Sequence, residues 1–179
     1  PSPDRVEPEC QFARQCGGCQ LQALSYEKQL EFKTSKVRGH LERIGGFTDL
    51  PMEEILGMEQ PFHYRNKAQF PVGRSKDGRI ITGFYAGRTH SIIENRDCAL
   101  GVPQNKEVLD RVIAHMEKFH IQPYDEITGR GLVRHVLIRY GFFTDEMMVC
   151  LIINGEKLPG EEALVESLRE IPQTTSVMV

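Results

Sequence analysis

Apolar and polar residues repeat along the chain with two different periods, and the helical period comes first. Apolar side chains recur at intervals of three, four or seven residues, at Tyr26, Leu30, Val37, Leu41 and Ile44. This spacing predicts an amphipathic helix. Ser25 is a suitable N-cap for it, and Gly45 and Gly46 supply the left-handed conformations that commonly end a helix.

From residue 64 the period changes to two, which is the period of a β-strand. An apolar set at Tyr64, Ala68, Phe70 and Val72 alternates with a polar set at Arg65, Lys67 and Gln69. A strand with this pattern has one apolar face and one basic face. Asp77-Gly78 is a strong hairpin signal. We therefore expect return strands at residues 79–85 and 89–94.

The second half of the chain continues with helices and strands in turn. Pro103 begins a segment of helical periodicity that reaches residue 119. Strands are expected at residues 131–140 and 147–153, a short helix at 161–169 and a last strand at 174–179. Because most links are of hairpin length, we expect an α+β fold: an antiparallel sheet with flanking helices and a Cys-rich loop that could bind a metal cluster.

Length and composition fit a soluble folded domain. The chain has 179 residues, of which 40% are hydrophobic and 26% charged. No window approaches the roughly 18 to 20 continuous apolar residues of a membrane helix, and no secretory signal is visible. The chain opens at Pro1 without a starting Met and stops inside a β-type pattern, so we expect it to be a segment of a longer protein.

Three of the five cysteines lie close together near the start of the chain. Cys10, Cys16 and Cys19 fall within ten residues, and Cys98 follows a predicted hairpin from which a loop could bring a fourth thiolate. An odd number of cysteines without a signal argues against a disulfide framework and for a reducing compartment, the cytoplasm. Cys150 lies in an apolar run and is expected to be a small buried hydrophobe.

The spacing of these thiols favours a shared metal and leaves its identity open. Structural zinc commonly uses two similar pairs of ligands, whereas this pattern has one tight group of three and one distant ligand. Ferredoxin-type clusters use four thiolates, and Gly17 and Gly18 would let backbone amides approach the cluster sulfurs. Iron–sulfur is therefore favoured over zinc, and unliganded thiols remain the third possibility.

Positive charge concentrates in one region of an acidic chain. Residues 61–90 hold six basic residues against one acidic residue, while the whole chain has a net charge of −3. The basic side chains are Arg65, Lys67, Arg74, Lys76, Arg79 and Arg88. A solvated hairpin would explain them equally well on composition alone. However, Arg65 and Lys67 share a strand face, and Cys98 follows at short range, so we interpret the region as a polyanion contact in which Arg88 and His90 also take part.

A second candidate for polyanion contact lies at residues 130–135. Arg134 and His135 are neighbours on a predicted strand and point to opposite faces. One of them could reach a ligand while the other contacts the core. For His135 alone, a hydrogen-bonded structural role is the simpler interpretation.

Several sequence strings together resemble the bacterial RNA uracil-C5-methyltransferases that act on 23S ribosomal RNA. The strings are Cys10-x5-Cys16-Gly-Gly-Cys19-Gln-Leu-Gln, Tyr26-x2-Gln29-Leu30-x2-Lys33, Leu41-x2-Ile44-Gly45, Tyr64-Arg65-Asn66-Lys67, Gly83-Phe84-Tyr85-Ala86-Gly87-Arg88, Asp97-Cys98 and Gly131-Leu132-Val133-Arg134-His135. They span nearly all of the chain. The cysteine string with its distant fourth Cys is the most specific of them.

The resemblance implies a [4Fe–4S] cluster on Cys10, Cys16, Cys19 and Cys98. It also implies a protein of three parts: a TRAM β-barrel, a central cluster domain, and a methyltransferase domain that binds S-adenosylmethionine. Residues 1–21 and 50–179 would form the central domain, which contacts RNA through Arg65, Lys67, Arg88, His90, Arg134 and His135. Residues 22–49 would form a helix that packs on the methyltransferase domain.

The resemblance places the catalytic groups outside this chain. In the family a cysteine adds to C6 of uracil, S-adenosylmethionine donates a methyl group to C5, and a base removes the C5 proton. The chain contains no glycine-rich cofactor loop between a strand and a helix. We therefore expect no turnover from this segment alone. The alternatives are a redox iron–sulfur protein and a zinc- or cluster-stabilised binding module.

Overall fold

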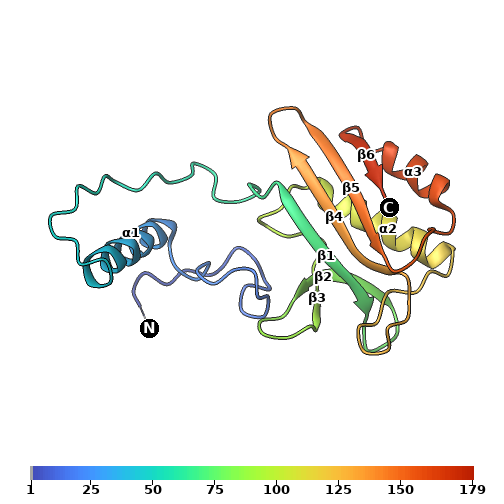
Figure 1. The fold of residues 1–179 in the computed structure, drawn as a ribbon, viewed down its shortest axis with the longest axis horizontal. Coiled ribbons are helices and arrows are strands. Elements are labelled where there is room, and N and C mark those ends of the chain that lie inside the picture. Colours follow the sequence, from blue (N-terminus) through green and yellow to red (C-terminus); the bar gives the residue numbers. More distant parts are fainter. Residues whose placement is uncertain (1) are drawn as a thin grey trace.

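The computed structural model describes residues 2–179 and consists of a six-stranded sheet with three helices (Figure 1). The strands are β1 (Lys67–Arg74), β2 (Ile80–Tyr85), β3 (Ile92–Glu94), β4 (Val133–Gly141), β5 (Glu146–Ile153) and β6 (Thr174–Met178). The helices are α1 (Tyr26–Arg43), α2 (Gln104–Lys118) and α3 (Glu161–Arg169). The strand order is β3-β2-β1-β4-β5-β6. The α+β class expected from the sequence is confirmed.

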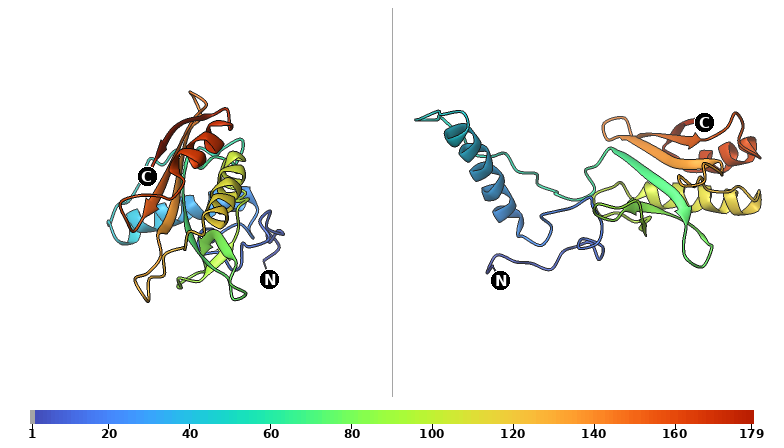
Figure 2. Two further views of the ribbon diagram at one scale, coloured as in Figure 1. Left: turned by 90° about the vertical axis from the view of Figure 1, so that its right-hand side faces the viewer. Right: turned by 60° about the horizontal axis from the view of Figure 1, so that its bottom comes forward.

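The core lies between the sheet and helices α2 and α3, which cover one face (Figure 2). Strand β1 shows the alternation that its sequence predicts, because Ala68, Phe70 and Val72 are buried whereas Lys67 and Gln69 are exposed. Phe70 has no exposed surface and packs against Phe84, with ring centroids 4.9 Å apart. The opposite face of the sheet is mixed, with polar Lys67 and Gln69 on β1 and apolar Met148 and Ile152 on β5.

The last strand pairs differently from the other five. Strands β1 to β5 pair antiparallel with their neighbours, but β6 pairs parallel with β5. Helix α3 separates these two strands, and a helical crossover returns the chain in the original direction. The expectation of antiparallel pairing throughout is therefore wrong at this edge, where the link is too long for a hairpin.

Two glycines set the shape of the hairpins. The turn between β1 and β2 contains Gly78 at φ 85°, as the Asp-Gly pair predicts. At Gly83 of β2, a Cβ atom would lie 1.9 Å from the carbonyl oxygen of Ile93. Strand β3 can therefore approach β2 this closely only because position 83 has no side chain.

Helix α1 lies apart from the sheet (Figures 1 and 2). The Ser25 side chain accepts a hydrogen bond from the Lys28 amide, so the predicted N-cap is confirmed. None of the helical residues is buried, and Val37 is 52% exposed. The amphipathic pattern is present, but its apolar side is covered only in part: residues 57–58 contact Tyr26 and Leu30, whereas Val37 stays exposed. No helix in the described residues is long and apolar enough to cross a membrane.

Candidate functional site

The cysteine loop is attached to the turn that follows β2. The Gly17 amide donates to the Tyr85 carbonyl at 3.0 Å, and the Gly87 amide donates to the Gln15 carbonyl at 3.2 Å. A Cβ at Gly17 would lie 3.3 Å from the Gly87 Cα, so the two backbones nearly touch. These contacts hold Cys16 next to a segment that is distant in sequence.

All four predicted ligand cysteines lie in one neighbourhood. Burial is the main cause that raises the pKa of the Cys19 thiol, and the nearby Cys98, Cys16 and Cys10 raise it further. The positive charge of Arg65 lowers that pKa and opposes them. Cys98 and Arg65, although distant in sequence, thus lie near enough to Cys19 to act on its charge. That Cys98 joins the other three thiols as a metal ligand stays a prediction.

Amide groups of the loop point at the sulfur atoms. The Gly18 amide donates to Cys16 Sγ at 3.4 Å, and the Gln22 side-chain amide donates to Cys19 Sγ at 3.5 Å. The Cys10 amide donates to the Gln22 side-chain oxygen at 3.2 Å, which fixes the orientation of that side chain. Hydrogen bonds to sulfur stabilise thiolate ligands and tune metal clusters. All the cysteines are free thiols.

The donor set fits a thiolate-bound metal, although the described residues form no closed ion site. No group of three or more His, Cys, Asp or Glu side chains among residues 2–179 is arranged to hold a metal ion. In a tetrahedral zinc site with Zn–S bonds near 2.3 Å, the sulfurs would be about 3.8 Å apart. A cluster with an inorganic core accepts a wider ring of thiolates. An iron–sulfur cluster in place of zinc therefore stays a prediction.

Cys150 does not belong to this group. It lies on β5 beside Leu137 of β4, on the sheet face away from the helices. Its side chain is half-buried, and the expectation of complete burial is therefore wrong. The reason is that no helix covers this face.

The predicted RNA-contacting residues divide into two groups. Arg65 lies beside the cysteines, and its amide donates to the Leu100 carbonyl at 2.9 Å. Lys67 and Arg88 are exposed, the latter in a turn at φ 62°. His90 is also exposed, but its Nδ1 lies 2.7 Å from a carboxylate oxygen of Glu126 and its ring stacks on Tyr85.

The second group lies at the start of β4. The guanidinium of Arg134 lies over the ring of Tyr124, 4.6 Å from its centroid, and its buried Nε has no hydrogen-bond partner in the described structure. His135 sits opposite Pro71 on β1. Burial is the larger cause that lowers the pKa of His135, and the charge of Arg134 lowers it further. His135 forms no hydrogen bond through its ring within the described residues, unlike the structural role expected for it.

Some basic residues of the described chain are paired with carboxylates and others are not. On and around α2, Arg96, Lys106 and Arg111 all form ion pairs with acidic side chains. Among the described residues, no ion pair within 4.0 Å involves Arg65, Lys67, Arg88, Arg134 or Arg139. These five cations lie just before β1, on β1 and β4, and in the turn after β2. The sequence analysis did not identify Arg139 as a candidate RNA contact. The one sign of its exposure was its position two residues after Leu137, on the same face of the strand.

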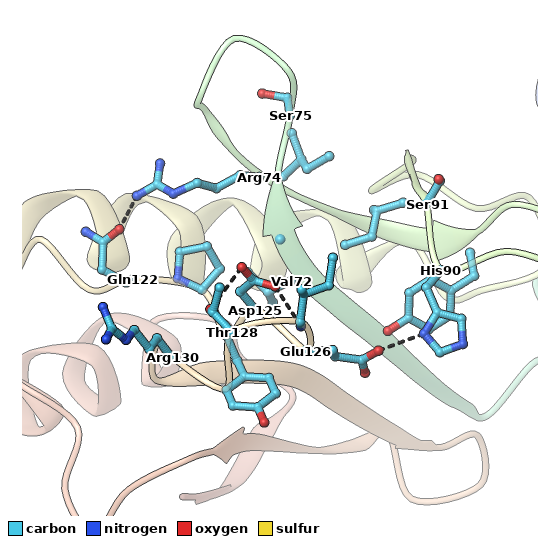
Figure 3. Close-up of a pocket in the computed structure, with 18 of the residues that line it drawn as sticks. Val72, Arg74, Ser75, His90, Ser91, Gln122, Asp125, Glu126, Thr128 and Arg130 are labelled. Atoms are coloured by element: carbon cyan, nitrogen blue, oxygen red, sulfur yellow. Dashed lines mark hydrogen bonds and ion pairs between the residues drawn. The ribbon is translucent and has the colours of Figure 1, made fainter.

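A groove of about 1130 Å³ opens between the β1–β2 hairpin and residues 122–131 (Figure 3). Arg74 reaches Gln122 across it, and His90 faces Glu126 at its other end. Asp125 accepts from the Thr128 hydroxyl at 3.0 Å and shapes the loop. Both basic and acidic side chains line the groove, so its electrostatic potential has no single sign. Sequence analysis did not identify this loop, although its glycines at 129 and 131 were a turn signal.

The fold and site define an α+β domain with a four-thiol neighbourhood and unpaired cations along two central strands. No family model matches the chain. A Clostridium tetani protein described as an uncharacterized RNA methyltransferase is 43% identical over 170 residues, which cover 95% of this chain and 36% of that protein. A similarly described protein of Halalkalibacterium halodurans is 44% identical over 178 residues, covering 99% and 39%. The chain is thus a homologue of RNA methyltransferases and spans less than two fifths of their length.

A solved structure agrees with this relation. The tRNA (uracil-54, C5)-methyltransferase of Pyrococcus abyssi, in complex with S-adenosyl-L-homocysteine, matches with a TM-score of 0.67 and 29% identity. The match covers 91% of this chain and 35% of that protein. The chain therefore corresponds to one part of an RNA methyltransferase-like protein.

Proposed function

We propose that this chain is the cluster-binding, RNA-positioning part of an S-adenosylmethionine-dependent methyltransferase that acts on C5 of uracil in 23S ribosomal RNA. The observation that carries the proposal is that nearly all of this chain is similar to part of RNA methyltransferases, together with the structural match to a uracil-C5 enzyme. The catalytic groups and the S-adenosylmethionine site belong to the rest of the polypeptide. The cytoplasm is the proposed compartment.

Cys10, Cys16, Cys19 and Cys98 would hold a [4Fe–4S] cluster. The amide donors of Gly18 and Gln22 and the shared neighbourhood of the four sulfurs support this assignment. The cluster would supply four metal–thiolate bonds that join the N-terminal loop to the segment after β3. Uracil methylation transfers no electrons, so its role is structural.

The chain itself would bind and orient RNA. Arg65, beside the four thiols, and the exposed Lys67 and Arg88 are free of carboxylate partners in the described structure and can bind phosphate oxygens. Arg134 and His135 would contact RNA at the start of β4. His90 would do so in competition with Glu126, its present partner at 2.7 Å. Mobile bases in RNA loops are the targets that such enzymes reach.

The domain division also remains a proposal. Residues 1–21 and 50–179 would form the central domain, while the helix within 22–49 would pack on the methyltransferase domain. The exposed apolar side chains of α1, with Phe32 47% and Val37 52% exposed, support this division. A TRAM domain would be the third part of the polypeptide.

The cluster is tested in the full-length enzyme, purified without oxygen. We expect about four iron and four sulfide per chain, loss of both in Cys98→Ala, and retention of both in the matched control Cys150→Ala. Zinc in place of iron would instead support the zinc-stabilised module. A methylation rate that followed the oxidation state of the cluster would support the redox alternative.

The RNA role is tested by charge reversal in the same enzyme. Arg65→Glu and Arg88→Glu should weaken binding to 23S RNA fragments and flatten the dependence of affinity on salt. Lys106→Glu is the control, because Lys106 is already paired with Asp110 at 2.6 Å. Unchanged affinity and unchanged salt dependence in both variants would end the proposal that these residues hold RNA. Mass spectrometry of the 23S RNA would identify the methylated base.

A further inference from the structure

The loop between β4 and β5 carries two adjacent exposed phenylalanines. Phe142 is 54% exposed and Phe143 is 103% exposed, which makes Phe143 the most exposed large apolar side chain of the described residues. The loop projects beyond the end of the sheet (Figure 1). Single exposed apolar residues need no explanation, but two aromatic rings at one tip form a surface.

The loop is held in one shape by its own bonds. The Asp145 amide donates to the Gly141 carbonyl at 2.8 Å, and the Tyr140 hydroxyl donates to the Asp145 carboxylate. The Tyr140 and Phe142 rings meet edge to face, with centroids 5.3 Å apart. Phe142 therefore braces the loop, and Phe143 is presented outward without a partner in the described structure.

Two cations lie at the base of this tip. Lys67 of β1 is directly opposite Arg139 of β4 in the strand register. Like charges directly opposite one another destabilise a sheet, and neither side chain has a carboxylate within ion-pair distance in the described structure. Both line a hollow of about 350 Å³ in which the one acidic side chain is Glu146. An anion between them would remove the repulsion.

We propose that this tip binds an unpaired stretch of RNA, with Phe143 stacked on a base and with Lys67 and Arg139 bound to phosphates of the same strand. Aromatic platforms beside cations are the usual means of holding single-stranded nucleic acid. The inference rests on the proposed function, and it adds a base-stacking residue and a phosphate contact on the sheet. The adjacent unpaired cations favour RNA over a protein partner for this surface.

The test uses the full-length enzyme and a fluorescent single-stranded fragment of 23S RNA, with affinity measured over a range of salt concentrations. Phe143→Ala should weaken binding by about 5- to 150-fold and leave the salt slope unchanged. Phe143→Trp should retain the affinity, whereas Phe143→Leu, which is apolar without a π face, should not. Arg139→Gln should reduce the salt slope by about 0.7.

Two further variants should not weaken binding. Glu146→Gln should tighten binding, because it removes the one acidic side chain from the hollow. Lys157→Gln should change nothing, since Lys157 is exposed and follows the opposite end of β5. Circular dichroism of each variant verifies that the sheet is folded.

The outcomes separate this inference from the proposed function. Failure of the unmodified enzyme to bind RNA would overturn both. Normal RNA binding by Phe143→Ala and Arg139→Gln would overturn the tip site alone. Normal RNA affinity in Phe143→Ala, combined with faster proteolytic separation of the domains, would show that the tip contacts protein and would also overturn it.

Discussion

Replacing Gly83 by Ala would test whether the close approach of β2 and β3 positions the fourth cysteine. The new Cβ would lie 1.9 Å from the Ile93 oxygen and 2.5 Å from the Asn95 nitrogen. Carbon contacts are relaxed near 3.5 Å, so β3 would have to move by roughly 1.5 Å. The hydrogen bond from the Asn95 amide to the Thr82 carbonyl, now 3.2 Å long, would break.

The expected cost follows from these contacts. Overpacking costs about 1–3 kcal/mol, and one or two lost backbone hydrogen bonds add about 1 kcal/mol each. A loss of about 2–5 kcal/mol lowers the thermal midpoint of a domain this size by roughly 5–20 °C. The displacement also moves Cys98, three residues beyond Asn95, so the variant should retain less iron.

Thermal unfolding followed by circular dichroism measures this effect, and Gly39→Ala is the matched control. A Cβ at Gly39 would meet no atom within 4 Å, and alanine favours a helix over glycine by roughly 0.5–1 kcal/mol. The control should therefore show no loss of stability. If Gly83→Ala unfolded at the same temperature as the unmodified protein, the argument from close backbone approach would be refuted.

Two other predictions concern the core and its dependence on pH. Phe70→Ala should destabilise the domain by about 3–5 kcal/mol, because Phe70 is completely buried against Phe84; urea unfolding measures this, and a cost under 1 kcal/mol would contradict the described core. Burial lowers the pKa of His115 below its ordinary value of 6.5, so the unfolded chain binds more protons and stability is lost as pH falls through and below 6.5. Urea midpoints at pH 7.5 and 5.5 should differ less in His115→Gln than in the unmodified protein, and an equal difference would assign the pH dependence to other groups.

Local features of this fold could be predicted from the sequence because neighbouring residues determine them. The alternation along β1, the Ser25 cap and the Asp-Gly turn all depend on positions a few residues apart. The parallel pairing of β6 could not be predicted in this way, because it depends on where α3 packs. Pattern alone also cannot say whether α1 has a surface to cover.

The candidate site shows the same limit. The grouping of Cys10, Cys16 and Cys19 is visible in the spacing, whereas their approach to Cys98 needed the motif as a guide. The sequence also cannot show which cations will lack a carboxylate partner, because ion pairs form between residues that only the fold brings together. Arg96 and Arg139 look alike in the sequence, yet Arg96 pairs with Asp110 at 2.7 Å and Arg139 has no such partner in the described structure.

The hydrogen bonds that tie the cysteine loop to the turn after β2 have a consequence for assembly. Small zinc modules acquire their fold from the metal, since the ligands meet only when it binds. Here backbone contacts between Gly17 and Tyr85 join the loop to a sheet with its own hydrophobic core. The polypeptide itself therefore anchors the loop that carries Cys16 to the sheet, and removal of any inorganic centre bound there should leave the sheet folded.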